Sequence, residues 1–214
     1  MISIVIPVFN EEKNVVPLYT AINKIMQEIS MPYEVIFVDD GSKDNTLRNL
    51  KRLQNNGITV GTLRIIELQK NYGQTFALLA GLHNTRGDKI ITMDGDQQND
   101  PKDIPRLLQE LGKGYDVICG WRKERNDSIM KKVPSRINNF LNRKFNKIAI
   151  HDSGCTMRAY RKKALIDIEL FAEDHRYLPA ILAKKGNTIR ELEVTHNHRK
   201  NGKSKYGINR LLRG

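Results

Sequence analysis

This 214-residue sequence has only two cysteines and no long hydrophobic run. Its two cysteines, Cys119 and Cys155, lack the spacing of a metal site and stand among apolar or small residues. This pattern predicts buried free thiols in a reduced compartment and argues against a disulfide scaffold. No apolar run approaches the length of a membrane-spanning helix, and Met1 leads straight into a predicted strand with no basic leader. We therefore expect a soluble chain that is not secreted.

A glycine-rich phosphate loop is missing too. No predicted strand is followed by the P-loop pattern or by the dinucleotide-binding pattern, which excludes those two ways of binding phosphate. The hydrophobic content of 39% is enough for one globular domain with a real core. We expect a single domain over residues 1–214.

The net charge of +12 is unevenly distributed along the chain. Residues 1–120 carry 13 basic and 15 acidic side chains, whereas residues 121–163 carry 13 basic and only 3 acidic ones. The second half is therefore expected to meet an anionic partner. Charge alone allows nucleic acid, an anionic membrane surface or a phosphorylated substrate.

Short apolar runs alternate with amphipathic segments in the first half. Buried strands are predicted at residues 3–9, 33–38, 62–68 and 90–93. Helices are predicted at residues 15–29, 47–53 and 75–82, and from Pro101 onward. The helix at 75–82 is nearly all apolar and is expected to be buried. The alternation predicts an α/β fold with a mostly parallel sheet flanked by helices on both faces.

Polar side chains follow each of the four predicted strands. Since the carboxyl ends of parallel strands meet at one edge, these side chains are expected around one crevice. They are Glu11, Asp39, Lys70, Asp94 and Asp96. Two carboxylates separated by one glycine can converge on a hard divalent cation, here Mg²⁺ or Mn²⁺. The alternative is a solvated turn in which Asp96 or Asn99 caps the next helix.

Several short motifs carry a resemblance to a known family. Four of them, in chain order, are Pro7-Val8-Phe9-Asn10-Glu11, Val38-Asp39-Asp40-Gly41-Ser42, Asn71-Tyr72-Gly73 and Met93-Asp94-Gly95-Asp96-Gln97-Gln98. They resemble the successive signatures of family 2 glycosyltransferases with the GT-A fold. Later motifs resemble the polyprenyl-phosphate hexose synthases: Gly120-Trp121-Arg122, Ser135-Arg136, Asp152-Ser153-Gly154, His175-Arg176-Tyr177-Leu178-Pro179 and Arg199-x-x-Gly202-x-Ser204-Lys205-Tyr206-Gly207.

This resemblance implies a nucleotide-sugar and metal half at residues 1–120. The divalent cation would be held by Asp94, Asp96 and Gln98. The residues expected to bind the nucleotide sugar are Pro7, Phe9, Glu11, Asp39, Lys70, Asp94, Asp152, Arg199 and Lys205. Among them, Asp39 would line the nucleoside pocket, Asp152 would bind sugar hydroxyls, and Arg199 and Lys205 would cover the diphosphate. For Asp39 and Asp152, capping a turn is the alternative.

The resemblance also implies an acceptor half at residues 121–214. Arg122 and Arg136 would bind the acceptor phosphate, because a planar guanidinium can bind two phosphate oxygens at once. A loop is expected to reach residue 132, followed by a basic amphipathic helix at 133–148 that either lies on a membrane or packs as an ordinary core helix. Asp174 stands where many sugar transferases place a general base, and His175 is expected to be a hydrogen-bonding or structural residue. Asp94, Asp96, Arg122, Arg136 and Asp174 are thus the expected catalytic residues.

The leading hypothesis is an inverting, metal-dependent transferase at the cytoplasmic face of a membrane. It would move a hexose from a nucleotide diphosphate, with UDP-sugar favoured and GDP-mannose possible, to a polyprenyl phosphate such as dolichyl or undecaprenyl phosphate. The resemblance implies that family members continue past residue 214 into a membrane-associated segment. We expect either a truncated chain or a peripheral member of the family.

Two other functions are open. The acceptor could be a sugar hydroxyl of a growing glycan, which would need Glu173 or Asp174 as general base. The basic half could be a nucleic-acid-binding module, but no nucleic-acid fold signature accompanies the charge and the aromatic residues are sparse. We therefore expect no nucleic-acid partner.

Arg136 provides the first test of this assignment. The Arg136→Ala variant should raise the KM for lipid phosphate and slow transfer, because each charge-assisted hydrogen bond contributes roughly 1.5 to 3 kcal/mol. Binding of the nucleotide sugar with metal, measured by calorimetry, should barely change. A tenfold weaker donor affinity with unaltered acceptor dependence would instead place Arg136 at the donor site.

Overall fold

The computed structural model describes residues 1–55, 61–123, 150–171 and 174–199. The expected loop and basic helix at 121–148 lie almost wholly outside these residues, as do Arg136 and Lys205. Among the described helices, none is both long enough and apolar enough to cross a membrane.

The first half consists of successive strand and helix pairs. The elements are β1 (Ile2–Val8), α1 (Val15–Ile29), β2 (Tyr33–Asp39), α2 (Thr46–Asn55), β3 (Thr62–Glu67), α3 (Gln74–His83), β4 (Lys89–Thr92), the 3-10 helix η1 (Pro101–Asp103) and α4 (Ile104–Gly112). Each strand and helix that the sequence predicted within residues 1–112 is present within a few residues of its expected bounds. The hydrophobic periodicity therefore identified this part of the fold correctly.

The second half adds three strands that the sequence did not predict. Its elements are β5 (Val117–Trp121), β6 (Arg158–Arg161), the 3-10 helices η2 (Lys162–Leu165) and η3 (Asp174–Arg176), α6 (Leu178–Lys184) and β7 (Ile189–Glu193). The seven strands form one sheet in the order β3-β2-β1-β4-β6-β5-β7. Only β6 runs against its neighbours, β4 and β5, so the described sheet is mostly parallel, as predicted.

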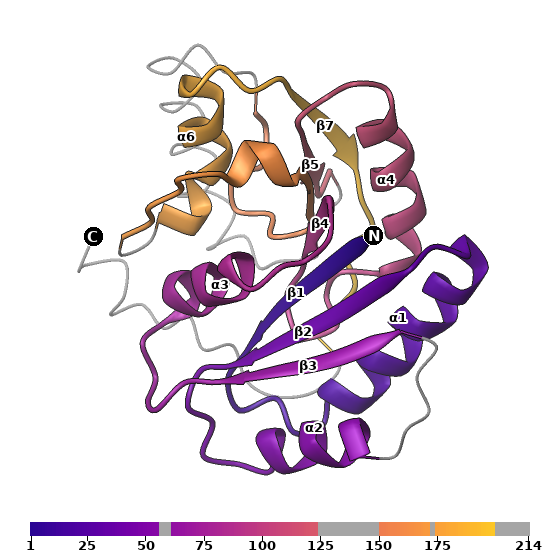
Figure 1. Cartoon of the computed structure of the whole chain (residues 1–214), viewed down its shortest axis with the longest axis vertical. Helices are drawn as coiled ribbons and strands as arrows, with labels where there is room; N and C mark the ends of the chain where they lie inside the picture. The colour runs from indigo at the N-terminus through magenta and orange to yellow at the C-terminus, as the bar shows by residue number, and fades with distance from the viewer. Residues whose placement is uncertain (56–60, 124–149, 172–173, 200–214) are drawn as a thin grey trace.

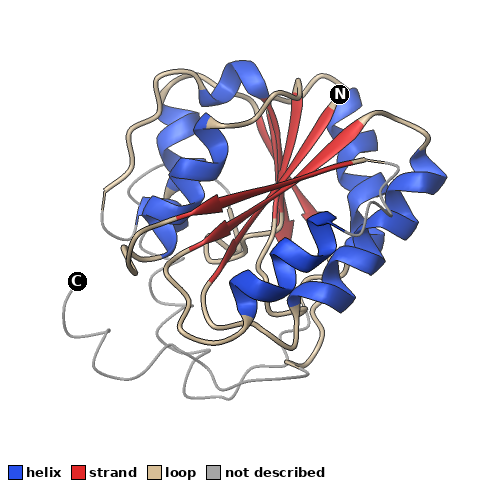
Figure 2. Cartoon of the chain, turned by 60° about the horizontal axis from the view of Figure 1, so that its bottom comes forward, coloured by secondary structure: helices blue, strands red, loops and turns tan. Residues whose placement is uncertain are grey.

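Helices cover both faces of this twisted sheet (Figures 1 and 2). One face packs against α1, α2 and α4, through residues such as Ile22, Leu50 and Leu107. The other face packs against α3 and α6, through residues such as Leu78 and Leu182. The two hydrophobic cores hold the carboxyl ends of the central strands at one edge, where the polar segments follow them.

The predicted burial of α3 is wrong on one side of the helix. Ala77, Leu78 and Leu82 are buried against the sheet, and Gly81 lies so close to Val5 that an added Cβ would stand 2.3 Å from the Val5 Cγ1 atom. Phe76, however, is 46% exposed. The helix covers the outside of the sheet, so only one of its faces has a neighbour to pack against.

A buried carboxylate stabilises the opposite, amino-terminal edge of the sheet. Glu34 on β2 is 1% exposed and accepts hydrogen bonds from Ser3 Oγ, the Arg86 backbone N–H and Arg64 Nη1 at 2.6, 2.7 and 3.0 Å. Burial disfavours its charged form, but these hydrogen bonds outweigh burial and hold the pKa of Glu34 below its ordinary value of 4.5. The charged side chain thus ties β1, β3 and the turn before β4 to β2.

Replacing this carboxylate should destabilise the whole sheet. In Glu34→Gln the amide N–H₂ would face the Arg64 donors, so we expect a loss of about 1 to 3 kcal/mol in urea unfolding at pH 7. Because the folded pKa is lowered, the ionised form stabilises the protein above pH 4.5, and the difference from wild type should shrink as pH falls through the folded pKa.

The matched control is Glu67→Gln, which removes a solvent-exposed partner of Lys51. It should change stability by no more than about 1 kcal/mol. Equal losses for the two variants would contradict the role assigned to Glu34.

Candidate functional site

An open crevice of about 240 Å³ lies at the carboxyl ends of β1, β2 and β4. Its lining residues are Pro7, Val8, Phe9, Glu11, Asp40, Asn71, Gly73, Gln74, Ala77, Asp94, Gly95, Asp96 and Arg199. Six of the residues proposed from the sequence to bind donor or metal are among them. The parallel topology has therefore brought together side chains that are up to 192 positions apart.

Asp94 and Asp96 stand where the chain leaves β4. The Asp94 backbone N–H donates to Asn99 Oδ1 at 2.9 Å, and Gln74 Nε2 donates to Asp94 Oδ1 at 2.9 Å. Asp96 Oδ1 accepts from the Gln98 backbone N–H at 3.0 Å. Gly95 between them is required, because an added Cβ would stand 2.5 Å from the Val8 Cγ1 atom.

The capping alternative for this turn is not what the structure shows. The side chain that caps η1 is that of Asp100, which accepts from the Lys102 backbone N–H at 3.0 Å. Asp96 and Asn99 instead accept backbone N–H groups of their own turn, those of Gln98 and Asp94. Asp96 is thus left with its second oxygen directed at the crevice.

The guanidinium of Arg199 meets the carboxylates of this crevice. Its Nη2 donates to Asp96 Oδ2 at 2.5 Å, and its Nη1 lies 3.6 Å from Glu11 Oε1. Burial, then the charge of Asp94, raise the pKa of Asp96 to about 6, although Arg199 pulls it down. Burial also raises the pKa of Asp94. The carboxylates of Asp94 and Asp96 therefore repel each other, and a cation in the crevice would stabilise their ionised forms.

A hydrogen-bonded chain fixes Glu11 beside the Asp96 turn. Asn14 Nδ2 donates to Glu11 Oε2 at 2.5 Å, and Gln97 Nε2 donates to Asn14 Oδ1 at 2.8 Å. The Glu11 backbone N–H donates to Thr46 Oγ1 at 2.7 Å. The start of α1, the start of α2 and the turn after β4 are thus held together at the crevice.

These side chains fit a divalent cation that is shared with a substrate. Mg²⁺ commonly takes one or two protein carboxylates and completes its oxygen shell from phosphate and water. Asp94 and Asp96 supply such oxygens, and Gln98 follows in the same turn. Among the described residues, no group of three or more His, Cys, Asp or Glu side chains forms a cage for a metal on its own. Phosphate oxygens would therefore have to complete the shell.

Asp39 and Lys70 do not line the crevice. Asp39 is 1% exposed and holds its own turn, accepting from both the hydroxyl and the backbone N–H of Ser42. Its neighbour Asp40 reaches the crevice and accepts from the backbone N–H groups of Tyr72 and Gly73 at 2.7 and 2.9 Å. Lys70 is exposed, with its Nζ 5.3 Å from the centre of the Tyr72 ring.

Arg122 and Asp152 form a two-pronged ion pair at the second half of the site. Arg122 Nε donates to Asp152 Oδ2 at 2.7 Å, and its Nη2 donates to Oδ1 at 2.9 Å. Both side chains are mostly buried, which by itself would lower the pKa of Arg122, but the hydrogen bonds to the Asp152 carboxylate help to raise it above its ordinary value. The pair fixes the guanidinium expected to bind the acceptor phosphate.

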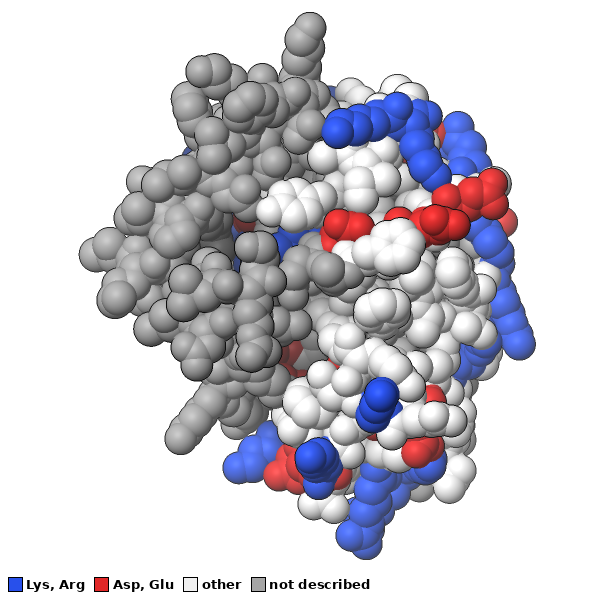
Figure 3. All heavy atoms as spheres, turned by 90° about the vertical axis from the view of Figure 1, so that its left-hand side faces the viewer, with Lys and Arg blue, Asp and Glu red and all other residues white. Residues whose placement is uncertain are grey.

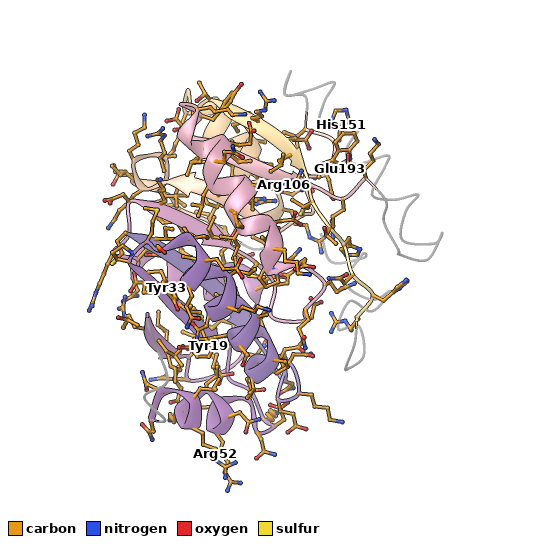
Figure 4. All side chains as sticks on the ribbon, turned by 90° about the vertical axis from the view of Figure 1, so that its right-hand side faces the viewer. Tyr19, Tyr33, Arg52, Arg106, His151 and Glu193 are labelled. Carbon is orange, nitrogen blue, oxygen red and sulfur yellow. The ribbon has the colours of Figure 1, made fainter. Side chains whose placement is uncertain are left out.

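The chain segments on either side of residues 124–149 meet next to this pair. The Trp121 ring stacks on the His151 ring, with centroids 4.6 Å apart, and His151 Nδ1 lies 2.6 Å from Glu191 Oε2. Figure 4 shows His151 in the same region as Glu193, which follows Glu191 on β7. Arg122 is therefore carried on a segment anchored to the edge of the sheet.

Asp174 opens η3 and has a structural partner. Its Oδ2 accepts from the Phe171 backbone N–H at 2.8 Å. His175, expected to be a hydrogen-bonding residue, is 3% exposed and has its Nδ1 2.7 Å from Thr75 Oγ1. Both cysteines are buried free thiols, as predicted.

Several residues of the site carried no assignment from the sequence. Asp40, Gln74, Thr75 and Arg158 line the crevice or the small hollow beneath it, or hold a residue that does. An arginine in the otherwise apolar or small segment 155–160 was the one available signal for Arg158. Nothing in the local sequence distinguished Asp40 from Asp39.

Comparison with known proteins identifies the family. Residues 3–169 match the family model described as Glycosyl transferase family 2. The chain belongs to this family. The GT-A fold inferred from its motifs is confirmed, since the sheet resembles that of glucosyl-3-phosphoglycerate synthase from Mycobacterium tuberculosis in complex with uridine diphosphate. That match has a TM-score of 0.74 and 17% identity and covers 99% of this chain and 74% of the other.

Curated relatives of this family 2 chain carry related names. A protein of Rhizobium johnstonii named dodecaprenyl-phosphate galacturonate synthase is 43% identical over 99% of this chain and 63% of its own length. A protein of Pseudomonas aeruginosa named undecaprenyl-phosphate 4-deoxy-4-formamido-L-arabinose transferase is 37% identical over 99% of this chain and 62% of its own. The chain thus spans less than two thirds of the length of these relatives.

The proton bound by Asp96 should compete with a metal ion. Since only the ionised carboxylate binds metal, Mn²⁺ affinity in the presence of uridine diphosphate should fall as pH is lowered through about 6, by about tenfold per unit below it. Electron paramagnetic resonance of free Mn²⁺ measures this directly.

Arg199→Gln is the informative variant, because Arg199 lowers the pKa of Asp96. In that variant the pH at which Mn²⁺ affinity begins to fall should move upward. An affinity independent of pH between about 7.5 and 5 would contradict the assignment of Asp96 as a ligand.

Proposed function

We propose that this chain is the catalytic domain of an inverting, metal-dependent transferase that moves a hexose from a nucleotide diphosphate to a polyprenyl phosphate. The observation that carries the proposal is the arrangement of the site. Asp94 and Asp96 line a crevice at the end of β4, and Arg122, whose charge acts on Asp94, is fixed by Asp152. One part suits a cation with a diphosphate, and the other suits an anionic acceptor.

The relatives support the acceptor class. The names of the Rhizobium and Pseudomonas proteins specify dodecaprenyl and undecaprenyl phosphate. A lipid-phosphate acceptor also agrees with the basic character of residues 121–163. On the described part of the face in Figure 3, most Lys, Arg, Asp and Glu side chains lie above and below an area of other residues. The domain would work at the cytoplasmic face of a membrane and contact its anionic surface.

The donor is proposed to be a uridine diphosphate sugar. Solved structures with the same fold were determined with uridine diphosphate and Mn²⁺ or Mg²⁺, among them glucosyl-3-phosphoglycerate synthase from Mycobacterium tuberculosis. In this chain, Pro7 and Phe9 would line the nucleoside part of the crevice. Asp94, Asp96 and Gln98 would hold Mg²⁺ or Mn²⁺, and Arg199 and Lys205 would cover the diphosphate.

The reaction requires alignment more than proton transfer. One oxygen of the acceptor phosphate attacks the anomeric carbon, and the bond from that carbon to the nucleoside diphosphate breaks with inversion. When bound, the cation would stabilise the charge of the departing diphosphate. Arg122, together with Arg136, would orient the attacking phosphate, which is already ionised at neutral pH and needs no general base.

Substitution of Asp174 distinguishes transfer to a lipid phosphate from transfer to a sugar hydroxyl. Its carboxylate accepts the Phe171 N–H, so in the described structure it stabilises a turn. Asp174→Asn should therefore retain transfer to lipid phosphate within about tenfold, whereas loss of a general base costs about 10² to 10⁴-fold.

The experiment uses the full-length protein with undecaprenyl phosphate in detergent, Mn²⁺ and a panel of radiolabelled nucleotide sugars. Lipid-linked product should form with a uridine donor and disappear on chelation. Asp88→Asn, at the far edge of the sheet, is the control for a lost carboxylate. Product that forms only on a glycan hydroxyl, and is lost with Asp174→Asn, would overturn the lipid-phosphate acceptor.

A further inference from the structure

Arg158 is a fully buried arginine between the two halves of the site. It lies on β6, where it pairs with Thr92 of β4 on one side and with Cys119 of β5 on the other. Its side chain is only 2% exposed. Burying a guanidinium is costly unless its donors are satisfied, so an arginine at this position needs a specific reason.

The partners of this guanidinium are backbone carbonyls of two separate segments. Nη1 donates to the carbonyl of His175 at 2.8 Å, and Nη2 donates to the carbonyl of Ser153 at 2.6 Å. Among the described residues, no carboxylate lies within ion-pair distance of it, and its Nε has no hydrogen-bond partner. Its charge therefore is not used to form a structural ion pair.

Both segments carry residues of the site. Ser153 follows Asp152, which holds Arg122, and His175 follows Asp174. His175 Nδ1 in turn meets Thr75 at the start of α3, next to the Gln74 that donates to Asp94. A continuous chain of contacts thus runs from the Asp94 side of the site, through α3 and η3, to the segment holding Arg122.

Arg158 also lies beside the end of β4, opposite Thr92. Asp94 and Arg158 line the same small hollow beneath the crevice, together with Gln74, Thr156 and His175. The positive charge of Arg158 is therefore close to the carboxylate expected to bind the cation.

We infer that Arg158 is a positioning residue. Its hydrogen bonds to the carbonyls of Ser153 and His175 fix the positions of the Arg122 segment and the η3 turn relative to Asp94. The inference rests on the proposed function, because it assigns Arg158 a part in aligning donor and acceptor. A purely structural arginine would affect stability alone, whereas a positioning residue also affects turnover.

The chain supplies a matched control on the same strand. Arg161 likewise donates to two backbone carbonyls, those of Tyr115 and Leu111, at 2.9 and 3.1 Å. These carbonyls lie at the far end of α4, away from the crevice. Arg158→Lys and Arg161→Lys therefore keep the charge and remove comparable hydrogen bonds, but only the first disturbs the site.

The two variants are compared in the full-length protein with uridine diphosphate sugar, Mn²⁺ and undecaprenyl phosphate. Arg158→Lys should lower kcat by about 10- to 100-fold, since small misplacements of reacting groups have such effects. The donor KM should stay within twofold, and Arg161→Lys should retain wild-type kcat. A kcat of Arg158→Lys within twofold of wild type would overturn the inference.

Two further measurements cover the other outcomes. If Arg158→Lys does not fold, Thr75→Val is measured instead, because it removes the Thr75–His175 contact from the same series of contacts. An unchanged kcat in Thr75→Val would contradict the inference. Should wild type transfer no sugar, the proposed function fails, and hydrogen exchange still tests the positioning. The backbone amides of residues 150–157 and 174–178 should then exchange faster in Arg158→Lys but not in Arg161→Lys. Equal exchange rates in the two variants would refute the positioning role of Arg158.

Discussion

Three carboxylates, Glu11, Asp94 and Asp96, converge on one crevice, and their mutual repulsion is the constraint around which the site is built. Asp94 and Asp96 are separated by a single residue in one turn, and burial alone would favour protonating them. The structure counters this with positive charge and hydrogen-bond donors directed at the cluster. Arg199 contacts Asp96 and approaches Glu11, and Gln74 holds Asp94.

The same constraint explains why a cation suits this crevice. A protein cannot keep several ionised carboxylates together at little cost unless something positive is close by. In the described structure a guanidinium supplies the charge. A divalent ion with a diphosphate would supply it in another form, and Arg199 would then be free to contact the phosphates.

Around Arg122, the proposed acceptor site, positive charge is arranged differently. Asp152 holds Arg122 by two hydrogen bonds, so the guanidinium is oriented but partly neutralised. Arg158 on β6 donates to the carbonyls of His175 and Ser153, and among the described residues it forms no ion pair with a carboxylate. Under the proposed function, Arg122 would face the acceptor phosphate and Arg158 would hold the segments around Arg122 in place.

The sequence by itself determined the alternating architecture of residues 1–112, since buried parallel strands and amphipathic helices leave clear periodicities, and it placed Asp94 and Asp96 at a strand end. It did not predict β5, β6 and β7, which are short strands without a periodicity of their own. Only the tertiary structure decided that Asp40 and not Asp39 lines the crevice, that Asp152 binds Arg122, and that Arg158 reaches Ser153 and His175. Such contacts depend on side-chain direction and on strand order, because one step along a strand moves a side chain to the other face of the sheet and the partners lie far apart in the chain.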